Sequence, residues 1–150
     1  MSLIIERFWK PQPKDVPGGL IAQERYYLSS GAVALANALV SFTSPVMPSN
    51  TLTVLTHWSA NLTGGAAQIS QRAVLQIVDP SGTAQFQLAQ EPNYVLAAAT
   101  QWSSTVVLGE GIVLRPNERI TLLGQFNAGV AANTLLAFVF GYRIPVGNTL

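Results

Sequence analysis

A serine triad in this chain would have to use His57, the only histidine among its 150 residues. A serine hydrolase uses a histidine base and many metallohydrolases use paired histidines, yet the sequence contains no Gly-x-Ser-x-Gly, His-Glu-x-x-His or P-loop motif. His57 stands beside Trp58 in an alternating run, which favours a half-exposed position on a strand over a catalytic one. Because cysteine is absent, disulfides, thiolate catalysis and cysteine metal sites are excluded as well.

Two glutamates, Glu110 and Glu118, flank a predicted strand–turn–strand corner and form the candidate pair for glycosidase-type chemistry. Solvated charge is normal at such a corner, so this interpretation is the weaker one. Asp79 offers oxygen ligands to a metal, but it opens the segment Asp79–Gly82, whose proline and glycine positions predict a type I turn. We therefore expect no enzyme, with no catalytic residue, no metal site and no cofactor.

The tryptophans leave a binding role open. Trp58 and Trp102 are candidate stacking platforms for a sugar, because β-sandwich lectins combine an aromatic face with a few amides. Packing in a core or in an interface explains the same two residues as well. Carbohydrate binding is therefore an alternative function rather than the first expectation.

Charge is scarce, since 8 basic and 7 acidic residues give a net charge of +1. This balance provides no electrostatic footprint for nucleic acid or for an anionic membrane. The longest apolar run, Ala32–Phe42, is too short to span a bilayer. From Tyr26 to Gln71 there is no formal charge. Either polar uncharged side chains keep this surface hydrated, or other subunits cover much of it; we favour the second interpretation, which predicts a dimer or trimer.

Residues 1–19 are expected to form an extended arm, and residues 20–150 a single domain. Prolines in the arm remove backbone donors and favour extended backbone, and Leu3–Phe8 before them has the composition of an edge strand. The arm either docks on a neighbouring subunit, where a short strand can add to an exposed edge, or folds over its own domain. In the docking interpretation its contact residues are Ile4, Ile5, Phe8, Trp9, Pro11 and Pro13.

Short strands separated by turns are predicted after the arm, and their spacing indicates an all-β sandwich or barrel. In the strand Thr51–Leu62 the alternation places Val54 and Trp58 on one face and Leu55 and His57 on the other. Gly109–Gly111 is expected to separate two strands. The predicted strands are Leu20–Leu28, Ala32–Thr43, Thr51–Leu62, Ala66–Val78, Thr83–Gln90, Gln101–Leu108, Ile112–Leu114, Glu118–Phe126 and Thr134–Ile144.

The last of these strands is apolar on both faces, which is typical of a strand that is buried on both faces. In a two-layer sandwich one face meets the other sheet, so the second face must meet something else, such as another subunit. The expected interface residues on that second face are Leu136, Phe138, Phe140 and Tyr142.

The carboxy-terminal third resembles a known protein family. The run Ile112–Leu122 looks like a corner of viral jelly rolls, with Asn117 where glycine is commoner; asparagine tolerates the same positive φ. The ending Phe140–Pro145 is similar to the closing strand of small jelly-roll virion proteins of tailed bacteriophages, among them capsid decoration or cement proteins. The resemblance implies an antiparallel jelly-roll β-sandwich of about eight strands, made in the host cytoplasm and assembled on the virion with a major capsid protein, without catalysis.

Three hypotheses follow. The first is a capsid decoration or cement protein that stabilises a phage head by adhesive contacts. The second is a carbohydrate- or receptor-binding jelly-roll module of a phage fibre or tail. The third, a cellular trimer of the tumour-necrosis-factor type, is disfavoured because no signal or anchor segment is expected in this sequence.

Overall fold

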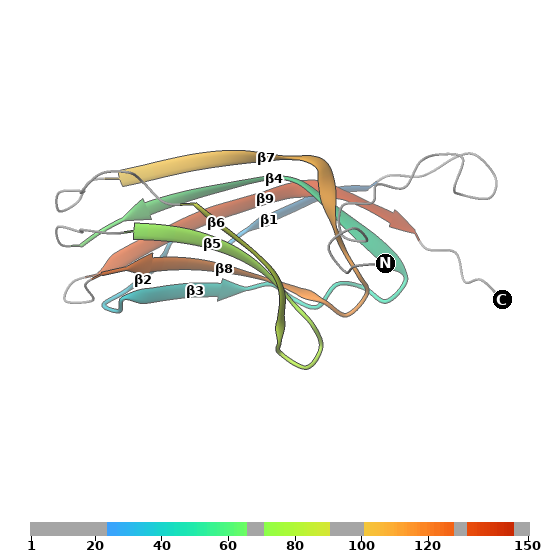
Figure 1. Cartoon of the computed structure of the whole chain (residues 1–150), viewed down its shortest axis with the longest axis horizontal. Helices are drawn as coiled ribbons and strands as arrows, with labels where there is room; N and C mark the ends of the chain where they lie inside the picture. Colours follow the sequence, from blue (N-terminus) through green and yellow to red (C-terminus); the bar gives the residue numbers. More distant parts are fainter. Residues whose placement is uncertain (1–23, 66–70, 91–100, 128–131, 146–150) are drawn as a thin grey trace.

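The computed structural model describes residues 24–65, 71–90, 101–127 and 132–145. In this part of the chain all regular structure is β, in two stacked sheets (Figure 1). The predicted arm, residues 1–19, lies outside the described residues. The strands are β1 (Glu24–Ser29), β2 (Val33–Leu35), β3 (Leu39–Thr43), β4 (Thr51–Thr63), β5 (Gln71–Val78), β6 (Ala84–Gln90), β7 (Gln101–Leu114), β8 (Arg119–Phe126) and β9 (Asn133–Pro145).

The strand pairing is that of a long hairpin. β1 pairs with β9, β3 with β8, β4 with β7 and β5 with β6, all antiparallel. This hairpin is rolled up so that β9 also pairs with β4, and β8 with β5. The result is a five-stranded sheet in the order β1-β9-β4-β7, with β2 also pairing with β9, facing a four-stranded sheet in the order β3-β8-β5-β6. This topology is a jelly roll, which confirms the predicted fold class.

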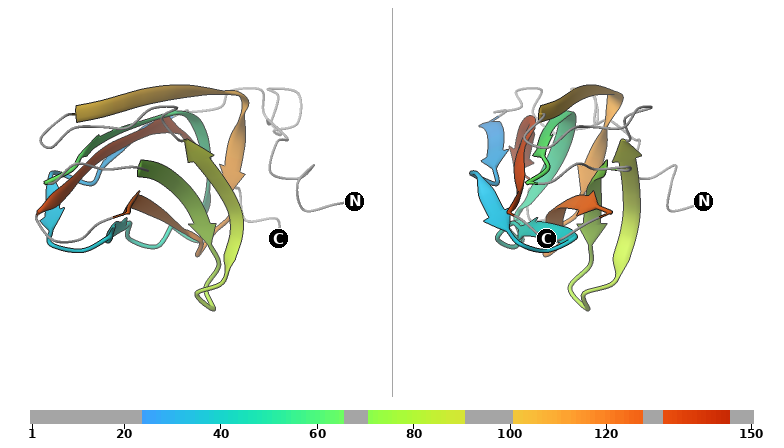
Figure 2. Two further views of the ribbon diagram at one scale, coloured as in Figure 1. Left: turned by 60° about the vertical axis from the view of Figure 1, so that its left-hand side comes forward. Right: turned by 90° about the vertical axis from the view of Figure 1, so that its left-hand side faces the viewer.

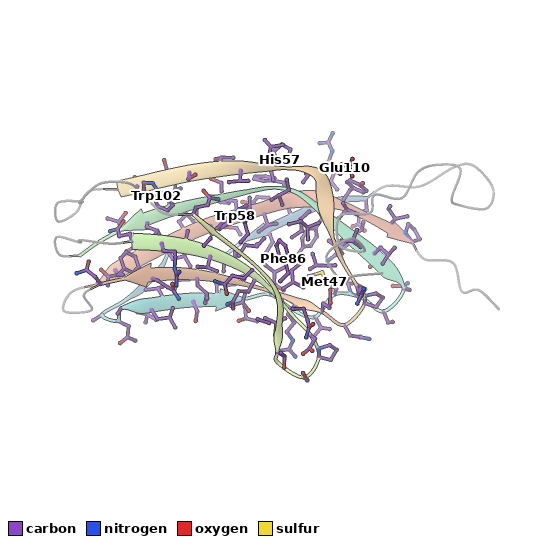
Figure 3. The ribbon with its side chains drawn as sticks, viewed as in Figure 1. Met47, His57, Trp58, Phe86, Trp102 and Glu110 are labelled. Atoms are coloured by element: carbon purple, nitrogen blue, oxygen red, sulfur yellow. The ribbon has the colours of Figure 1, made fainter. Side chains whose placement is uncertain are left out.

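The core lies between the two sheets. Every second residue of the central strands points into it, so strongly apolar positions recur with the period of two that a strand requires. The predicted inward residues of β5, Leu75 and Ile77, are fully buried, and Phe86 and Leu88 of β6 pack against the same cluster. Figure 3 shows the side chains of Trp58, Phe86 and Met47 in this space.

The predicted strand Ala32–Thr43 is wrong in one respect, because the chain forms two strands there. β2 pairs with β9 of the five-stranded sheet, and β3 pairs with β8 of the four-stranded sheet. Between them the backbone bends, and its carbonyls find partners elsewhere: Asn133 Nδ2 donates to Asn37 O (2.8 Å), and Phe126 N donates to Ala38 O (2.7 Å). The segment thus crosses from one sheet to the other.

The predicted break at Gly109–Gly111 is also wrong, since β7 continues through it as a sharp bend, visible in Figures 1 and 2. Gly109 and Gly111 have φ values of 53° and 92°, which favour glycine. Opposite the bend, β4 shifts register between Leu55 and His57. Because this β-bulge inserts one residue, Leu55 and Trp58 both join the core, contrary to the simple alternation.

The predicted turn at Asp79–Gly82 is confirmed. The Gly82 N–H donates to the Asp79 carbonyl (3.0 Å). Asp79 Oδ1 accepts from the Ser81 N–H (2.9 Å), the Ser81 hydroxyl (2.6 Å) and the Thr83 N–H (2.9 Å), and Oδ2 accepts from Gln85 (2.7 Å). These bonds lower the pKa of the Asp79 carboxyl, the Ser81 side-chain bond most and the Thr83 backbone bond next.

The expectation for Asn117 is confirmed as well. Its φ is 67°, and among the described residues it is the one non-glycine with a positive φ. Asn117 N donates to the Met47 carbonyl (3.0 Å), and Met47 N donates to the Glu118 carbonyl (2.8 Å). The left-handed residue therefore fixes the β7–β8 corner against the loop between β3 and β4.

Candidate interaction surface

The two faces of β9 meet different surroundings. Leu135, Ala137 and Val139 face the core and are fully buried. Phe138 and Phe140 alternate with them and therefore point away from the core, on the outer side of the five-stranded sheet. Phe140 remains 43% exposed and Phe138 half-buried, as are Leu136 and Tyr142, the other two predicted interface residues. The outer face of β9 is thus apolar and only partly covered by the described residues.

One row of residues crosses this outer face from edge to edge. Tyr27 of β1 lies opposite Phe140 of β9, Phe140 opposite His57 of β4, and His57 opposite Val107 of β7. Tyr27 is 56% exposed and Val107 67%. The Tyr27 ring lies 5.2 Å from the Phe140 ring and 6.2 Å from the Phe138 ring, between centroids. Three aromatic rings therefore form one exposed cluster, which with His57 and Val107 we call the outer-face patch.

Mostly small polar residues flank the patch on one side of the same face. Thr105 Oγ1 donates to Ser59 Oγ (3.1 Å), which ties β7 to β4 beside the aromatic cluster. None of the residues that share these rows carries a formal charge. They are Ser29 on β1, Thr134 and Leu136 on β9, Ser59, Asn61 and Thr63 on β4, and Gln101, Ser103 and Thr105 on β7.

His57 lies on this surface. Figure 3 shows it on the outer side of the sheet, while Trp58 points between the sheets. Its Nδ1 lies 2.9 Å from the Thr56 hydroxyl, and that hydroxyl donates to the Phe140 carbonyl (3.3 Å). Within the described part of the chain, no three histidine, cysteine, aspartate or glutamate residues gather closely enough to hold a metal ion.

The two glutamates weighed as an acid–base pair have different surroundings. Glu110 is exposed at the bend of β7, whereas Glu118 is buried at the β7–β8 corner. Glu118 Oε2 accepts a hydrogen bond from the Arg115 N–H (2.8 Å), so this carboxylate closes the turn. Its position is explained by the corner it stabilises.

The tryptophans weighed as sugar platforms lie in the core. Trp58 is 1% exposed and Trp102 8%, and both belong to the cluster between the sheets. Neither indole presents a ring face to solvent in this arrangement, because both side chains point into the core. The sequence does not predict that Tyr27 joins the exposed aromatic residues of β9. Only its pairing opposite Phe140 reveals it, and that pairing joins residues far apart in the chain.

The arm residues Ile4, Ile5, Phe8, Trp9, Pro11 and Pro13 lie outside the described residues. In the described part of the chain there is no helix with the length and apolar character needed to cross a membrane.

Comparisons with known proteins concern the fold. No family model matches the chain, and no curated protein matches it. Among solved structures, a chain in the structure of infectious bursal disease virus Gx strain is 14% identical to this one. The match covers 85% of this chain and 34% of that chain, with a TM-score of 0.42. The coat protein of tobacco streak virus is 10% identical, with 90% and 93% covered and a TM-score of 0.39.

An enzyme is among the similar structures too. An aminopeptidase from a marine sediment Thaumarchaeota archaeon is 9% identical, with 84% of this chain and 33% of that chain covered and a TM-score of 0.44. This chain thus spans about a third of the viral protein compared first and of the aminopeptidase.

Proposed function

We propose that this protein is a structural component of a virion, and specifically a decoration or cement protein on the head of a tailed bacteriophage. The observation that supports this proposal is the outer-face patch, an exposed aromatic cluster on the outer sheet of a jelly roll, with Arg25 as the charged residue next to it on β1. Such a patch favours contact with another protein, because its own residues carry no formal charge that would have to be desolvated. The resemblance of Ile112–Leu122 and Phe140–Pro145 to virion jelly rolls supports the same role.

The adhesive contribution of the patch can be estimated from its two most exposed rings, Tyr27 and Phe140. They are 56% and 43% exposed, and a buried aromatic side chain covers about 150–250 Å². Covering both rings removes about 200 Å² from water, which is worth about 5 kcal/mol before the cost of association. One such contact is weak, but a lattice that holds many copies binds them by avidity.

The partners in this proposal are other copies of the chain, as a dimer or trimer, and a major capsid protein. The outer face of β9, with Leu136, Phe138, Phe140 and Tyr142, supplies the subunit contact. The arm supplies a second contact outside the patch.

The direct test is the protein content of purified particles. Virions are purified by density gradient from host cells that express the protein, and its peptides are quantified by mass spectrometry. We expect the protein in the particles at a fixed ratio to the major capsid protein. The double variant Tyr27→Ser and Phe140→Ser should be depleted from particles, whereas Leu39→Ser, which removes an exposed leucine of β3 on the other sheet, should not. Abundant protein in the lysate with none in the particles contradicts the proposal.

A further inference from the structure

Among the described residues, the outer edge of β1 has no partner strand. β1 pairs with β9 on one side, and no other described strand pairs with it. An antiparallel strand directs its N–H and C=O groups alternately to its two sides, so this edge offers hydrogen bonds to a further strand.

A groove runs along this edge. Its volume is about 380 Å³, and it lies between β1 and the loop Pro45–Met47, with Arg143 completing its lining. The Arg143 guanidinium lies over the Tyr26 ring, 4.6 Å from the centroid. Val46 on the opposite wall is 43% exposed. The groove therefore combines an open strand edge with apolar and aromatic walls.

We propose that this groove binds the segment Leu3–Arg7 of a neighbouring copy as an added antiparallel strand on β1. The inference rests on the proposed function, because it requires copies of the chain to meet in an assembly. The order of residue types in the two segments supports this pairing. Leu-Ile-Ile-Glu-Arg, read backwards, is complementary to Glu-Arg-Tyr-Tyr-Leu at the start of β1.

In one antiparallel register, the charged residues of the two segments lie opposite residues of the other sign, and the apolar residues lie opposite apolar ones. It places Glu6 opposite Arg25 and Arg7 opposite Glu24. The same register places an aliphatic residue opposite each of the next three positions: Ile5 opposite Tyr26, Ile4 opposite Tyr27, and Leu3 opposite Leu28. Directly opposed residues share a face of the sheet, so Leu3 and Ile5 join the inward side and Ile4 extends the outer-face patch. A shift by one residue would move every side chain of the arm to the opposite face of the sheet. A shift by two residues would place Glu6 and Arg7 opposite uncharged residues of β1 or beyond its end.

The other edge strands lack this complement. β3 and β6 contain no charged residue, and neither does the Gln101–Leu108 part of β7. Glu6 and Arg7 would stay unpaired on each of them. Among the described edges, β1 is thus the one whose charges match the arm.

The sequence between the two segments favours a neighbouring copy over the same chain. Pro11, Pro13 and Pro17 fall within seven residues, and a proline-rich stretch behaves as an extended spacer of about 3.1 Å per residue. Such a spacer carries Leu3–Arg7 away from its own β1, whereas pairing within one chain would require the same stretch to reverse direction.

The test uses the absence of cysteine in the chain. Glu6→Cys and Arg25→Cys are made in separate full-length chains, one with a size tag, which are then mixed and oxidised. Directly opposed residues of an antiparallel pair have Cα atoms about 4.5–5.5 Å apart, within the range of about 4.4–6.8 Å that a disulfide spans. We expect a disulfide-linked heterodimer on a non-reducing gel. The matched control, Arg7→Cys with Arg25→Cys, is one residue out of register and should form at most a small fraction of that product.

A charge exchange tests the register without cross-linking. Glu6→Arg alone and Arg25→Glu alone should each raise the dissociation constant of self-association about two- to five-fold, the range of an exposed ion pair. The chain with both substitutions should return close to the starting value. The inference is overturned if no heterodimer forms or if the out-of-register control cross-links equally well. It is also overturned if one chain that carries both Glu6→Cys and Arg25→Cys forms the disulfide only within itself, or if the charge-exchanged chain does not recover its self-association.

The outcomes also separate this inference from the proposed function. If the cross-link fails while the unmodified protein is present in purified particles, only the strand addition is lost. If the cross-link forms while the protein is absent from particles, the chain exchanges its arm with other copies but is not a virion component.

Discussion

Gly141 of β9 lies so close to Val54 of β4 that a β-carbon on residue 141 would lie 1.9 Å from the Val54 carbonyl oxygen. The two residues lie next to the position where β4 shifts its register between Leu55 and His57. The bulge brings the backbone of β4 against β9, and only a hydrogen fits between them. The bend of the five-stranded sheet therefore depends on a glycine in its central strand.

Replacing Gly141 with alanine should destabilise the fold by about 3 kcal/mol or more, because backbone must move to admit the methyl group. Urea unfolding followed by tryptophan fluorescence measures this loss. Gly31→Ala is the control, because its added β-carbon meets nothing within 4 Å. Its loss of stability comes only from the φ of 63° and should be about 1–2 kcal/mol. Equal losses in the two variants would contradict the close approach.

Asn117 gives a prediction about backbone conformation alone. With a φ of 67°, Asn117→Gly should keep the stability within about 0.5 kcal/mol, whereas Asn117→Val should lose about 2 kcal/mol because a β-branched residue resists the left-handed region. Thermal unfolding of both variants measures the difference. A valine variant as stable as the glycine variant would show that the corner does not require positive φ.

Local features of this fold could be predicted from the sequence, and features set by a partner strand could not. The turn at Asp79 and the left-handed Asn117 each depend on a few neighbouring residues, whose types favour one backbone conformation. The bulge in β4 depends instead on the bend at Gly109–Gly111, in a strand far along the chain. Alternation alone therefore placed Leu55 on the wrong face.

In the candidate surface, too, local features could be predicted and features set by a partner strand could not. The apolar outer face of β9 was predicted from Phe138 and Phe140, because alternation within one strand needs no partner. Tyr27 was missed as their neighbour, since its position opposite Phe140 depends on pairing between the two ends of the chain. Trp58 and Trp102 were considered for sugar binding because composition alone does not tell an inward ring from an outward one.

The Asp79 carboxylate should make stability depend on pH. Its pKa is lowered in the folded state, by the Ser81 side-chain bond first, so it stabilises the fold at a pH above the ordinary carboxyl range. This contribution is lost as the pH falls through the lowered pKa. Asp79→Asn should therefore melt below the unmodified protein at pH 6, and the gap should narrow below about pH 4.

The control for that measurement is Glu110→Gln, which removes one exposed carboxylate at the bend of β7. Its melting temperature should follow the unmodified protein across the same pH range. A gap between Asp79→Asn and the unmodified protein that stays constant with pH would refute the role of the carboxylate charge.

The outer-face patch predicts weaker self-association in the double variant Tyr27→Ser and Phe140→Ser. Each ring is about half exposed within one chain, so the melting temperature at high dilution should fall by only a few degrees, whereas the dissociation constant should rise at least tenfold (about 1.4 kcal/mol). Light scattering after size exclusion, repeated across a dilution series, measures the change. The Leu39→Ser variant provides the matched comparison, and an equal effect there would rule out the patch as the contact.

The position of β9 has a consequence for how the protein is made. This strand is synthesised after all the others, yet it lies between β1 and β4 in the five-stranded sheet. β1, the first strand, has no other described partner and must wait until nearly the whole domain has left the ribosome. Of the four pairs in the long hairpin, only β5 with β6 joins neighbours in sequence, so the remaining ladders form against a growing cost of loop closure. We therefore expect folding to be slow, to begin at the β5–β6 turn, and to leave nascent chains dependent on chaperones until β9 has left the ribosome.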